Sequence, residues 1–294
     1  MENKSALPIF KPSWLRVKAP GGTQYQHTKS LIDRLALHTV CREAHCPNVG
    51  ECWAAKTATF MILGDNCTRY CNFCAVKKAP QELAPPLTDE PQRVAEAVKT
   101  LELKHAVITS VTRDDLADFG AGHFAAVVRE VKKLSPECRV ELLIPDLQGS
   151  RKDLETIVKS GVDVLGHNLE TVPRLYAHVR KGADYHRSLW VLAQAKEIRS
   201  QLVTKSGVMV GLGETYQEIL NLMDDLRTNG VDILTIGQYL RPSPAQVPVV
   251  RYVPPEEFQE YAFIGRSKGF NFVEAGPLVR SSYRAWRHCA RARS

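Results

Sequence analysis

The distribution of cysteines constrains this chain more than any other feature of its sequence. Six of its 8 cysteines lie between positions 41 and 74, and the other two, Cys138 and Cys289, stand far away. A secreted, disulfide-stabilised domain is usually short and spreads its cysteines over the whole fold. A chain of 294 residues with bunched cysteines instead predicts ligands for a metal or an iron–sulfur cluster. We interpret the two isolated cysteines as incidental thiols.

The composition is that of an ordinary globular protein. Hydrophobic residues make up 44% of the chain and charged residues 24%, which excludes long disorder, collagen-like sequence and a coiled coil. No run approaches the roughly 18–20 apolar residues that span a bilayer. The N-terminal sequence MENKSALPIF has neither an apolar signal core nor an Arg-rich transit pattern. We therefore expect a cytoplasmic protein with no membrane partner.

From about residue 57, short apolar runs alternate with amphipathic stretches. The expected strands are 57–63, 105–109, 139–144, 162–165, 207–210 and 231–236. The expected helices between them are 91–101, 121–134, 152–159, 188–198 and 214–227. Alternation of this kind predicts parallel βαβ units. Since six units fit rather than eight, we expect an α/β fold built as a partial (β/α)6 TIM-like barrel.

The two flanking segments do not share this rhythm. Residues 1–56 are predicted to form an N-terminal extension with one short helix near 29–37, and residues 57–240 form the expected barrel. Residues 241–294 open with the proline-rich RPSPAQVPVVRYVPPEEF. They are expected to close the barrel with a helix at 256–268, a strand-like NFVEAG and a basic tail.

The first cysteine motif reads CTRYCNFC, so that Cys67, Cys71 and Cys74 have the spacing C-x3-C-x2-C. Three thiolates can bind three irons of a [4Fe-4S] cluster and leave the fourth iron open. Structural zinc commonly takes four protein ligands, and an iron–sulfur electron carrier usually supplies four cysteines. An open iron indicates chemistry at the cluster. The motif also follows the first expected strand, where parallel barrels build their active sites.

This motif, followed by six βα units, resembles the radical S-adenosylmethionine (SAM) superfamily. The resemblance implies that the open iron binds the amino and carboxylate groups of SAM. One-electron reduction then cleaves the sulfonium and yields a 5′-deoxyadenosyl radical, which abstracts hydrogen from a C–H bond.

Residues near the ends of later strands are candidates for SAM binding, although each is also read as a turn, cap or core residue. Hydroxyls and carboxylates of the segment TSVTRDD (109–115), which is also read as a solvated turn, are expected to meet the methionine ammonium. The segment GHNLE (166–170) contains Asn168 and Glu170, which are expected to bind the ribose hydroxyls. The candidates are Phe73, Thr109, Ser110, Asn168, Glu170, Gly211 and Gly213.

A second triad, Cys41, Cys46 and Cys52, has the spacing C-x4-C-x5-C and precedes the first expected strand. Three interpretations remain open for the residues themselves: a second [4Fe-4S] cluster, a zinc site that uses His45, or free buried cysteines. Zinc requires a fourth ligand, and His45 directly precedes Cys46 in the chain.

The two triads in this order resemble lipoyl synthase. HNLETVPRLYAHVRKGADYHRSL (167–189) and GPLVRSSYRA (276–285) agree with that family, and the resemblance covers residues 12 to 286. It implies that a serine of the RSSYRA element is the fourth ligand of an auxiliary cluster. We assign Ser282 to this role, with Ser281 as the alternative. A serine oxygen is a harder ligand than a thiolate, which suits a cluster that comes apart.

The resemblance also implies the reaction. Two sulfur atoms are inserted at C6 and C8 of an octanoyl chain on a lysine of a carrier domain. The auxiliary cluster at Cys41, Cys46, Cys52 and Ser282 donates the sulfur and is consumed. The implied cofactors are two [4Fe-4S] clusters and SAM as cosubstrate. The implied partners are octanoylated domains of 2-oxoacid dehydrogenase E2 and the glycine cleavage H protein, and an electron donor such as flavodoxin or ferredoxin. Hydrogen-atom abstraction needs no general base, so His167 is interpreted as structural.

The formal net charge is +7, and basic residues gather near the C-terminus. A solvated tail and a docking patch for an acidic carrier are both open, whereas nucleic-acid binding is not expected without a recognisable module. The alternative functions are another sulfur-inserting radical SAM enzyme of the biotin synthase or methylthio-transferring type, a non-enzymatic two-cluster electron carrier, and a zinc-binding module. The gathered residues are Arg280, Arg284, Arg287, Arg291 and Arg293.

Overall fold

The computed structural model describes residues 10–79 and 82–291. Within them, an eight-stranded sheet has the order β1-β2-β5-β6-β7-β8-β9-β10. Every neighbouring pair is parallel except β1 and β2, which are antiparallel. The strands are β1 (His38–Thr39), β2 (Thr59–Ile62), β5 (His105–Ser110), β6 (Arg139–Leu143), β7 (Val164–Gly166), β8 (Val203–Val210), β9 (Ile233–Gln238) and β10 (Phe272–Gly276).

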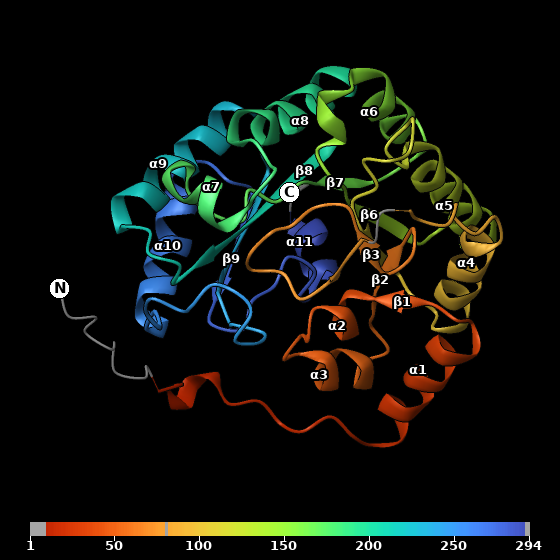
Figure 1. The fold of residues 1–294 in the computed structure, drawn as a ribbon, viewed down its shortest axis with the longest axis horizontal. Coiled ribbons are helices and arrows are strands. Elements are labelled where there is room, and N and C mark those ends of the chain that lie inside the picture. Colours follow the sequence, from red (N-terminus) through yellow and green to blue (C-terminus); the bar gives the residue numbers. More distant parts are fainter. Residues whose placement is uncertain (1–9, 80–81, 292–294) are drawn as a thin grey trace.

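The sheet curls into a partial barrel with helices around its outside (Figure 1). The predicted fold class is confirmed, because the six expected strands are present and parallel. A further strand, β10, continues the sheet from the expected C-terminal closing segment. The outer helices are α4 (Glu90–Thr100), α5 (Ala121–Leu134), α6 (Arg151–Val158), α8 (Tyr185–Ile198), α9 (Tyr216–Thr228) and α10 (Pro255–Ser267).

Two elements differ most in extent from the sequence prediction. Helix α1 (Thr23–Arg34) begins six residues before the expected start at residue 29, directly after Gly22, whose φ is 93°. Strand β8 begins at Val203 rather than at 207, because its polar residues are buried inside the barrel. Lys205 is 0% exposed and its ammonium contacts Glu141 at 2.6 Å. Pairing of this kind allows a charged residue to occupy a core position.

Local sequence explains where several outer helices begin. Helix α9 starts with a capping box, in which the Thr215 hydroxyl and the Glu218 carboxylate each accept a backbone N–H of the other residue. The Ser150 hydroxyl caps α6, and the Asp184 carboxylate caps α8. Such caps satisfy backbone donors that have no partner within the helix. They fix the helices that cover the parallel strands.

The flanking segments complete the barrel. The N-terminal extension carries α1, α2 (Val40–Glu43) and α3 (Val49–Ala54) beside β1 and β2. Helix α11 (Ala285–Arg291) lies in the middle of the ring of strands in Figure 1 and contacts β5 and β10. Its His288 is 0% exposed. The expected boundaries at 56/57 and 240/241 stay predictions, since β1 and β10 join the same sheet as the barrel strands.

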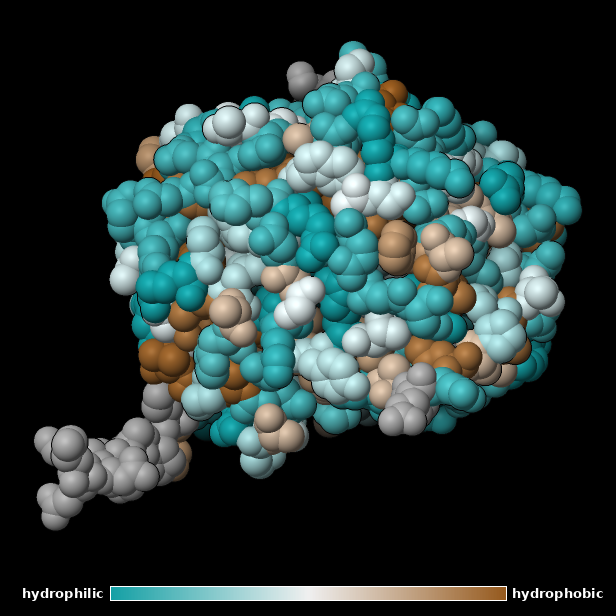
Figure 2. Space-filling view, turned by 45° about the horizontal axis from the view of Figure 1, so that its top comes forward, coloured by the Kyte–Doolittle hydropathy of each residue, from teal (hydrophilic) through white to brown (hydrophobic). Residues whose placement is uncertain are grey.

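The surface in Figure 2 is mostly hydrophilic, with hydrophobic residues scattered in small groups. Among the described residues, no helix has the length and apolar character required to cross a bilayer. Cys138 lies in the core at 2% exposure. The side chains of Cys289 and Arg291, and all of Arg293, lie outside the described residues.

Candidate functional site

The loop that contains Cys67, Cys71 and Cys74 follows β2 at the carboxyl ends of the parallel strands. Cys67 ends the short strand β3 (Asn66–Cys67), which pairs with β4 (Lys77–Lys78). Its sulfur accepts the backbone N–H groups of Arg69 and Thr112 at 3.5 and 3.4 Å. The pKa of the Cys71 thiol is raised to about 11, mainly by burial, with the charge of Arg180 lowering it and the charges of Cys74 and Cys67 adding to the rise. The three predicted ligands are therefore electrostatic neighbours in one loop.

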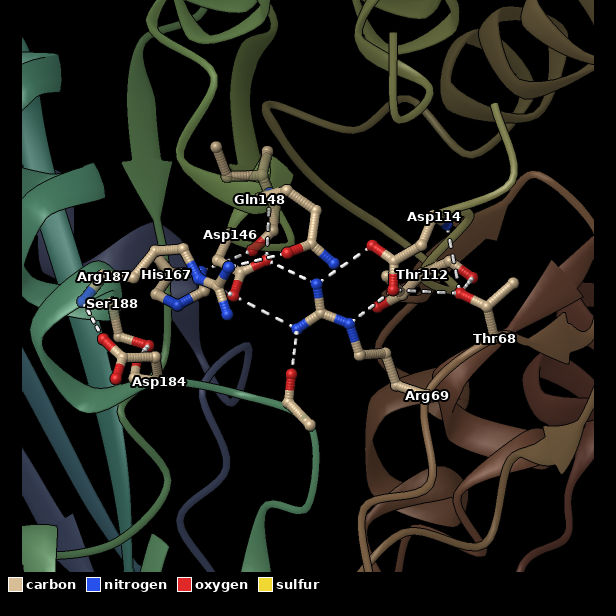
Figure 3. A network of polar contacts seen from close by, with 12 residues as sticks. Thr68, Arg69, Thr112, Asp114, Asp146, Gln148, His167, Asp184, Arg187 and Ser188 are labelled. Atoms are coloured by element: carbon tan, nitrogen blue, oxygen red, sulfur yellow. Dashed lines mark hydrogen bonds and ion pairs between the residues drawn. The ribbon is translucent and has the colours of Figure 1, made fainter. Parts of the chain in front are cut away.

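Arg69 fastens this loop to the barrel (Figure 3). Its guanidinium contacts the Asp114 carboxylate after β5 at 2.6 and 2.9 Å, and the Asp146 carboxylate after β6 at 2.7 and 3.1 Å. It also donates to the backbone oxygen of Gly182 at 3.2 Å. Arg69 is only 8% exposed. Paired, charge-assisted hydrogen bonds of this geometry are among the strongest in proteins, so three segments are locked together.

Asp146 carries the most buried carboxylate of this network, with a side chain 0% exposed. Burial by itself raises the pKa of Asp146, but the hydrogen bonds and charge of Arg69 outweigh it and lower the pKa to about 2. Arg187 adds a second contact, from Nε to the carboxylate at 2.9 Å. The carboxylate is therefore ionised wherever the protein is folded near neutral pH.

The segment 109–115 differs from expectation. Arg113 is 3% exposed and binds Asp115 at 2.8 Å, together with the backbone oxygens of Leu63 and Ala84. It is therefore a buried structural residue rather than part of a solvated turn. Asp114 and Asp115 are each engaged by an arginine. Both carboxylates are thus held in place by arginines of the same region.

The second triad lies in the N-terminal extension. Cys41 is in α2, Cys52 is in α3, and Cys46 is in the turn between them. The Cys41 thiol is hydrogen-bonded to the backbone of Thr59, and burial raises its pKa to about 11. Burial, followed by the charges of the other two cysteines, raises the pKa of Cys52 to about 12. Thiols of this kind are neutral at pH 7 and become thiolates when a metal displaces their protons.

The RSSYRA element comes to this triad from the other end of the chain. The Thr59 hydroxyl donates to the Ser282 hydroxyl oxygen at 2.7 Å, and the backbone of the same Thr59 contacts Cys41. Ser281 is directed elsewhere, because its hydroxyl donates to the Asn168 side-chain oxygen at 3.1 Å. Ser282 is therefore the serine on the side of the triad, and Ser281 faces the candidate SAM residues.

The candidate SAM residues at the ends of β5 and β7 have different surroundings. The Thr109 hydroxyl donates to the backbone oxygen of Leu143 at 2.8 Å and is thus engaged within the sheet. The Ser110 hydroxyl is buried, with no hydrogen-bond partner among the described residues. Asn168 donates to the Glu170 carboxylate at 3.0 Å. A buried hydroxyl without a partner is costly, so Ser110 marks a place where a bound ligand would supply one.

The remaining SAM candidates are mainly structural. Gly211 has a φ of 98°, and a Cβ there would lie 2.2 Å from the Gln238 side chain, so only glycine fits. Its N–H is bound by the Glu214 carboxylate at 2.6 Å. Gly213 has a φ of 107° and looser surroundings. Phe73 packs on the cluster formed by Val179, Leu212, Tyr239 and Val247. This contact matches the alternative interpretation of Phe73 as a core aromatic.

Two arginines that the sequence analysis did not assign to the barrel interior link the predicted sites. Arg180 binds the Tyr176 hydroxyl at 2.8 Å and carries its charge close to Glu170 and Cys71. Arg280 is close enough to Cys46 and Glu170 for its charge to act on both. Arg280 belongs to the RSSYRA element, whereas no sequence signal separates Arg180 from the other members of a total of 39 Lys+Arg.

His167 has the structural environment that was expected. It is 0% exposed, and its Nδ1 lies 2.9 Å from the backbone oxygen of Ile144. Since that oxygen can only accept, Nδ1 carries the hydrogen. Burial lowers the pKa of His167 to about 3, so the ring is neutral.

The donor geometry also bears on zinc. Within residues 10–79 and 82–291, no three His, Cys, Asp or Glu side chains converge closely enough to hold a single metal ion. His45, the expected zinc ligand, is exposed and has a φ of 50°. Tetrahedral zinc needs four donors around one ion, whereas each thiolate of an iron–sulfur cluster binds a different iron. Each triad supplies three thiols, so a zinc ion at either one would need a fourth donor.

Family models match two parts of the chain. The model of the radical SAM superfamily matches residues 61–226. The model of the N-terminal domain of lipoyl synthase of the radical SAM family matches residues 2–46. The first match contains the CTRYCNFC loop, and the second contains Cys41 and Cys46.

Solved structures with a similar fold have low sequence identity to this chain. The [FeFe]-hydrogenase maturase HydG from Carboxydothermus hydrogenoformans has a TM-score of 0.58 at 15% identity, over 82% of this chain and 63% of that one. Methylornithine synthase has a TM-score of 0.51 at 14% identity, over 77% and 71%. These likenesses show the fold alone.

Curated relatives are similar over nearly the whole chain. The lipoyl synthase of Rubrobacter xylanophilus is 54% identical over 94% of this chain and 85% of its own length. The lipoyl synthase of Koribacter versatilis is 55% identical over 95% and 91%, and that of Thermus thermophilus is 54% identical over 94% and 85%. With two cysteine triads, a partial parallel barrel and this degree of identity, the chain belongs to the lipoyl synthase family of radical SAM enzymes.

Proposed function

We propose that this enzyme inserts two sulfur atoms at C6 and C8 of a protein-bound octanoyl-lysine. In this proposal an auxiliary [4Fe-4S] cluster at Cys41, Cys46, Cys52 and Ser282 supplies the sulfur. The observation that carries the proposal is the position of Ser282. Its hydroxyl lies 2.7 Å from that of Thr59, beside Cys41, although 223 residues separate Thr59 from Ser282.

The donor sets fit the groups that the proposal requires. Membership of the superfamily implies one [4Fe-4S] cluster and SAM, and Cys67, Cys71 and Cys74 are its proposed ligands. The second triad offers three further thiols and one hydroxyl oxygen. The unpartnered hydroxyl of Ser110 supports a ligand near the end of β5. When bound, these groups supply reductive cleavage of SAM at one site and sulfide at the other.

The protein's own residues orient these sites. Arg69 holds the CTRYCNFC loop against the ends of β5 and β6. Asn168 and Glu170, which are hydrogen-bonded to each other, are proposed to bind the ribose of SAM. Asn168 also accepts the hydroxyl of Ser281, so a side chain near the proposed SAM site touches the element that carries Ser282. The two proposed reaction centres are thus adjacent.

The proposed partners follow from the same reaction. The substrate is a lipoyl carrier domain, such as that of a 2-oxoacid dehydrogenase E2 or the glycine cleavage H protein, and the reductant is a flavodoxin or ferredoxin in the cytoplasm. An acidic carrier would complement the net charge of +7. Arg287, which stacks on the exposed Trp286 at 5.1 Å, is available to such a partner.

The decisive experiment counts clusters before and after turnover. The protein is purified anaerobically and reconstituted, and then receives SAM, a reductant and an octanoyl-lysine peptide. We expect about eight irons, with loss of one cluster for each lipoyl group formed. Zinc, a single cluster, or sulfur insertion with both clusters retained would overturn the proposal.

The serine assignment has its own test. Ser282→Ala should abolish lipoyl formation, because the auxiliary cluster loses its fourth protein ligand. Ser281→Ala should keep that ligand and weaken only the contact with Asn168. Loss of product in the Ser281 variant alone would overturn the assignment.

A further inference from the structure

The segment between the second and third cysteines of the auxiliary triad contacts the C-terminal element at two points. The first is Asn48, which directly precedes α3. Asn48 is 4% exposed, and its Nδ2 donates to the backbone oxygen of Leu278 at 2.7 Å. The contact joins residues 230 positions apart. It fixes the chain just before the RSSYRA element begins.

The second point of contact is Glu51. Its carboxylate accepts the Tyr283 hydroxyl at 3.0 Å and the Arg284 guanidinium at 2.9 Å. Glu51 lies three residues after Asn48, so the two side chains are on one face at the start of α3. Both contact residues 278–284, the segment that we call the strap. They hold it on either side of the two serines.

The backbone of this strap depends on such contacts. Arg284 has a φ of 50°, a left-handed conformation that is unfavourable for a residue with a side chain. Conformations of this kind persist only where the surroundings impose them. The Glu51 contact is on this same residue, so it holds the turn through which the strap passes into α11.

We infer that Glu51 is a positioning residue, which docks the RSSYRA strap on the auxiliary triad and so keeps Ser282 beside the cysteines. This inference rests on the proposed function, in which Ser282 is a cluster ligand. Glu51 itself does not bind the cluster; it holds the segment that carries the ligand. The Glu51 carboxylate is hydrogen-bonded to Tyr283 and Arg284 of the C-terminal element.

The chain contains a matched control for a simple surface ion pair. Arg151 and Glu197 contact each other at 3.0 Å with side chains 48% and 59% exposed. Arg284 and Glu51 contact each other at 2.9 Å with side chains 40% and 54% exposed. The two pairs match in chemistry, distance and exposure, but only one joins the strap to the triad.

The first test uses hydrogen exchange in the protein without clusters. In Glu51→Gln, amides of residues 278–284 should exchange roughly two- to five-fold faster than in the wild type, as expected for the loss of an exposed ion pair. Tyr283→Phe should give a smaller increase in the same segment. Glu197→Gln should leave that segment unchanged. An unchanged exchange rate in Glu51→Gln overturns the inference.

The second test follows the auxiliary cluster alone, in a background with Cys67→Ala, Cys71→Ala and Cys74→Ala. Glu51→Gln should release iron to a chelator several-fold faster than Glu197→Gln, and its Mössbauer spectrum should shift toward that of Ser282→Ala. A spectrum and release rate equal to those of Glu197→Gln overturn the inference.

The two proposals fail in different ways. If the background protein binds no iron at the triad, the proposed function fails, and the hydrogen exchange of the apoprotein still decides the role of Glu51. If Ser282→Ala alters the spectrum while Glu51→Gln does not, the function stands and the positioning role falls.

Discussion

The two cysteine triads are held by contacts of opposite character. The CTRYCNFC loop is fastened by Arg69, 8% exposed, to an Asp146 side chain that is 0% exposed. The strap that carries Ser282 is fastened to the other triad in part by Glu51 and Arg284, whose side chains are 54% and 40% exposed. Breaking one partner of a buried pair is strongly destabilising, whereas exposed pairs contribute little.

This difference corresponds to the two proposed fates of the clusters. A cluster that cleaves SAM in every cycle must keep its geometry, and Arg69 ties its loop to the ends of β5 and β6 and to Gly182. A cluster that donates its sulfur must be rebuilt. The strap that carries its serine ligand therefore has to move away from the triad with only a small loss of free energy. The charged contacts are thus buried at one triad and exposed at the other.

The largest effect should come from Arg69→Met, which leaves the buried Asp146 without its main partner. We expect a loss of about 3–5 kcal/mol in the free energy of unfolding of the apoprotein, the usual cost of breaking a buried pair. SAM cleavage should fall by about 100-fold, because the loop is displaced. Denaturant unfolding measures the stability, and 5′-deoxyadenosine formation measures SAM cleavage. Normal SAM cleavage in this variant would contradict the claim that the Arg69 contacts fix the CTRYCNFC loop.

A second, intermediate effect concerns the strap. A Cβ on Gly237 would lie 2.1 Å from the backbone oxygen of Val279, so Gly237→Ala should push the strap away from β9. We expect a loss of about 1–3 kcal/mol in unfolding free energy and faster chelation of auxiliary iron. The control is Gly21→Ala, where a Cβ has nothing within 4 Å. Equal chelation rates in both variants would argue against a role of the strap in retaining auxiliary iron.

The Asp146 carboxylate predicts a pH dependence. Its folded pKa of about 2 lies below the ordinary value of 3.8. The stabilisation is therefore complete above the ordinary value and disappears as the pH falls through the folded pKa. Between pH 6 and pH 3 the wild-type apoprotein should lose about 1 kcal/mol of stability relative to Asp146→Asn. Urea unfolding at both pH values measures the stability difference between the two proteins. A difference that does not change with pH would contradict the lowered pKa of Asp146.

The smallest effect should be that of salt. Raising the salt concentration to about 1 M shortens the screening length to about 3 Å, which weakens the exposed Glu51–Arg284 pair but not the buried Arg69 pairs. Iron release from the auxiliary triad should rise about two-fold, and release from the other triad should stay constant. Equal salt sensitivity at both triads would remove the distinction between them.

Much of the fold was predictable because its signals are local. The amphipathic periodicity of 121–134 gave α5 with its observed bounds, Ala121–Leu134. The start of β8 could not be predicted in this way, because Lys205 reads as a surface residue until Glu141 is seen beside it. The position of Arg113 has the same explanation, since its buried partners come from other loops.

The sequence by itself determined the chemistry that this protein can support. The spacing of six cysteines, and their order relative to a strand–helix repeat, are local properties that need no structure to be read. Only the tertiary structure decided which distant residues join them. Ser282 meets Thr59, Arg69 meets Asp146, and Glu51 meets Arg284 across 223, 77 and 233 residues. Such contacts exist because the curled sheet brings together loops, and segments before and after the barrel strands, that are far apart in the sequence.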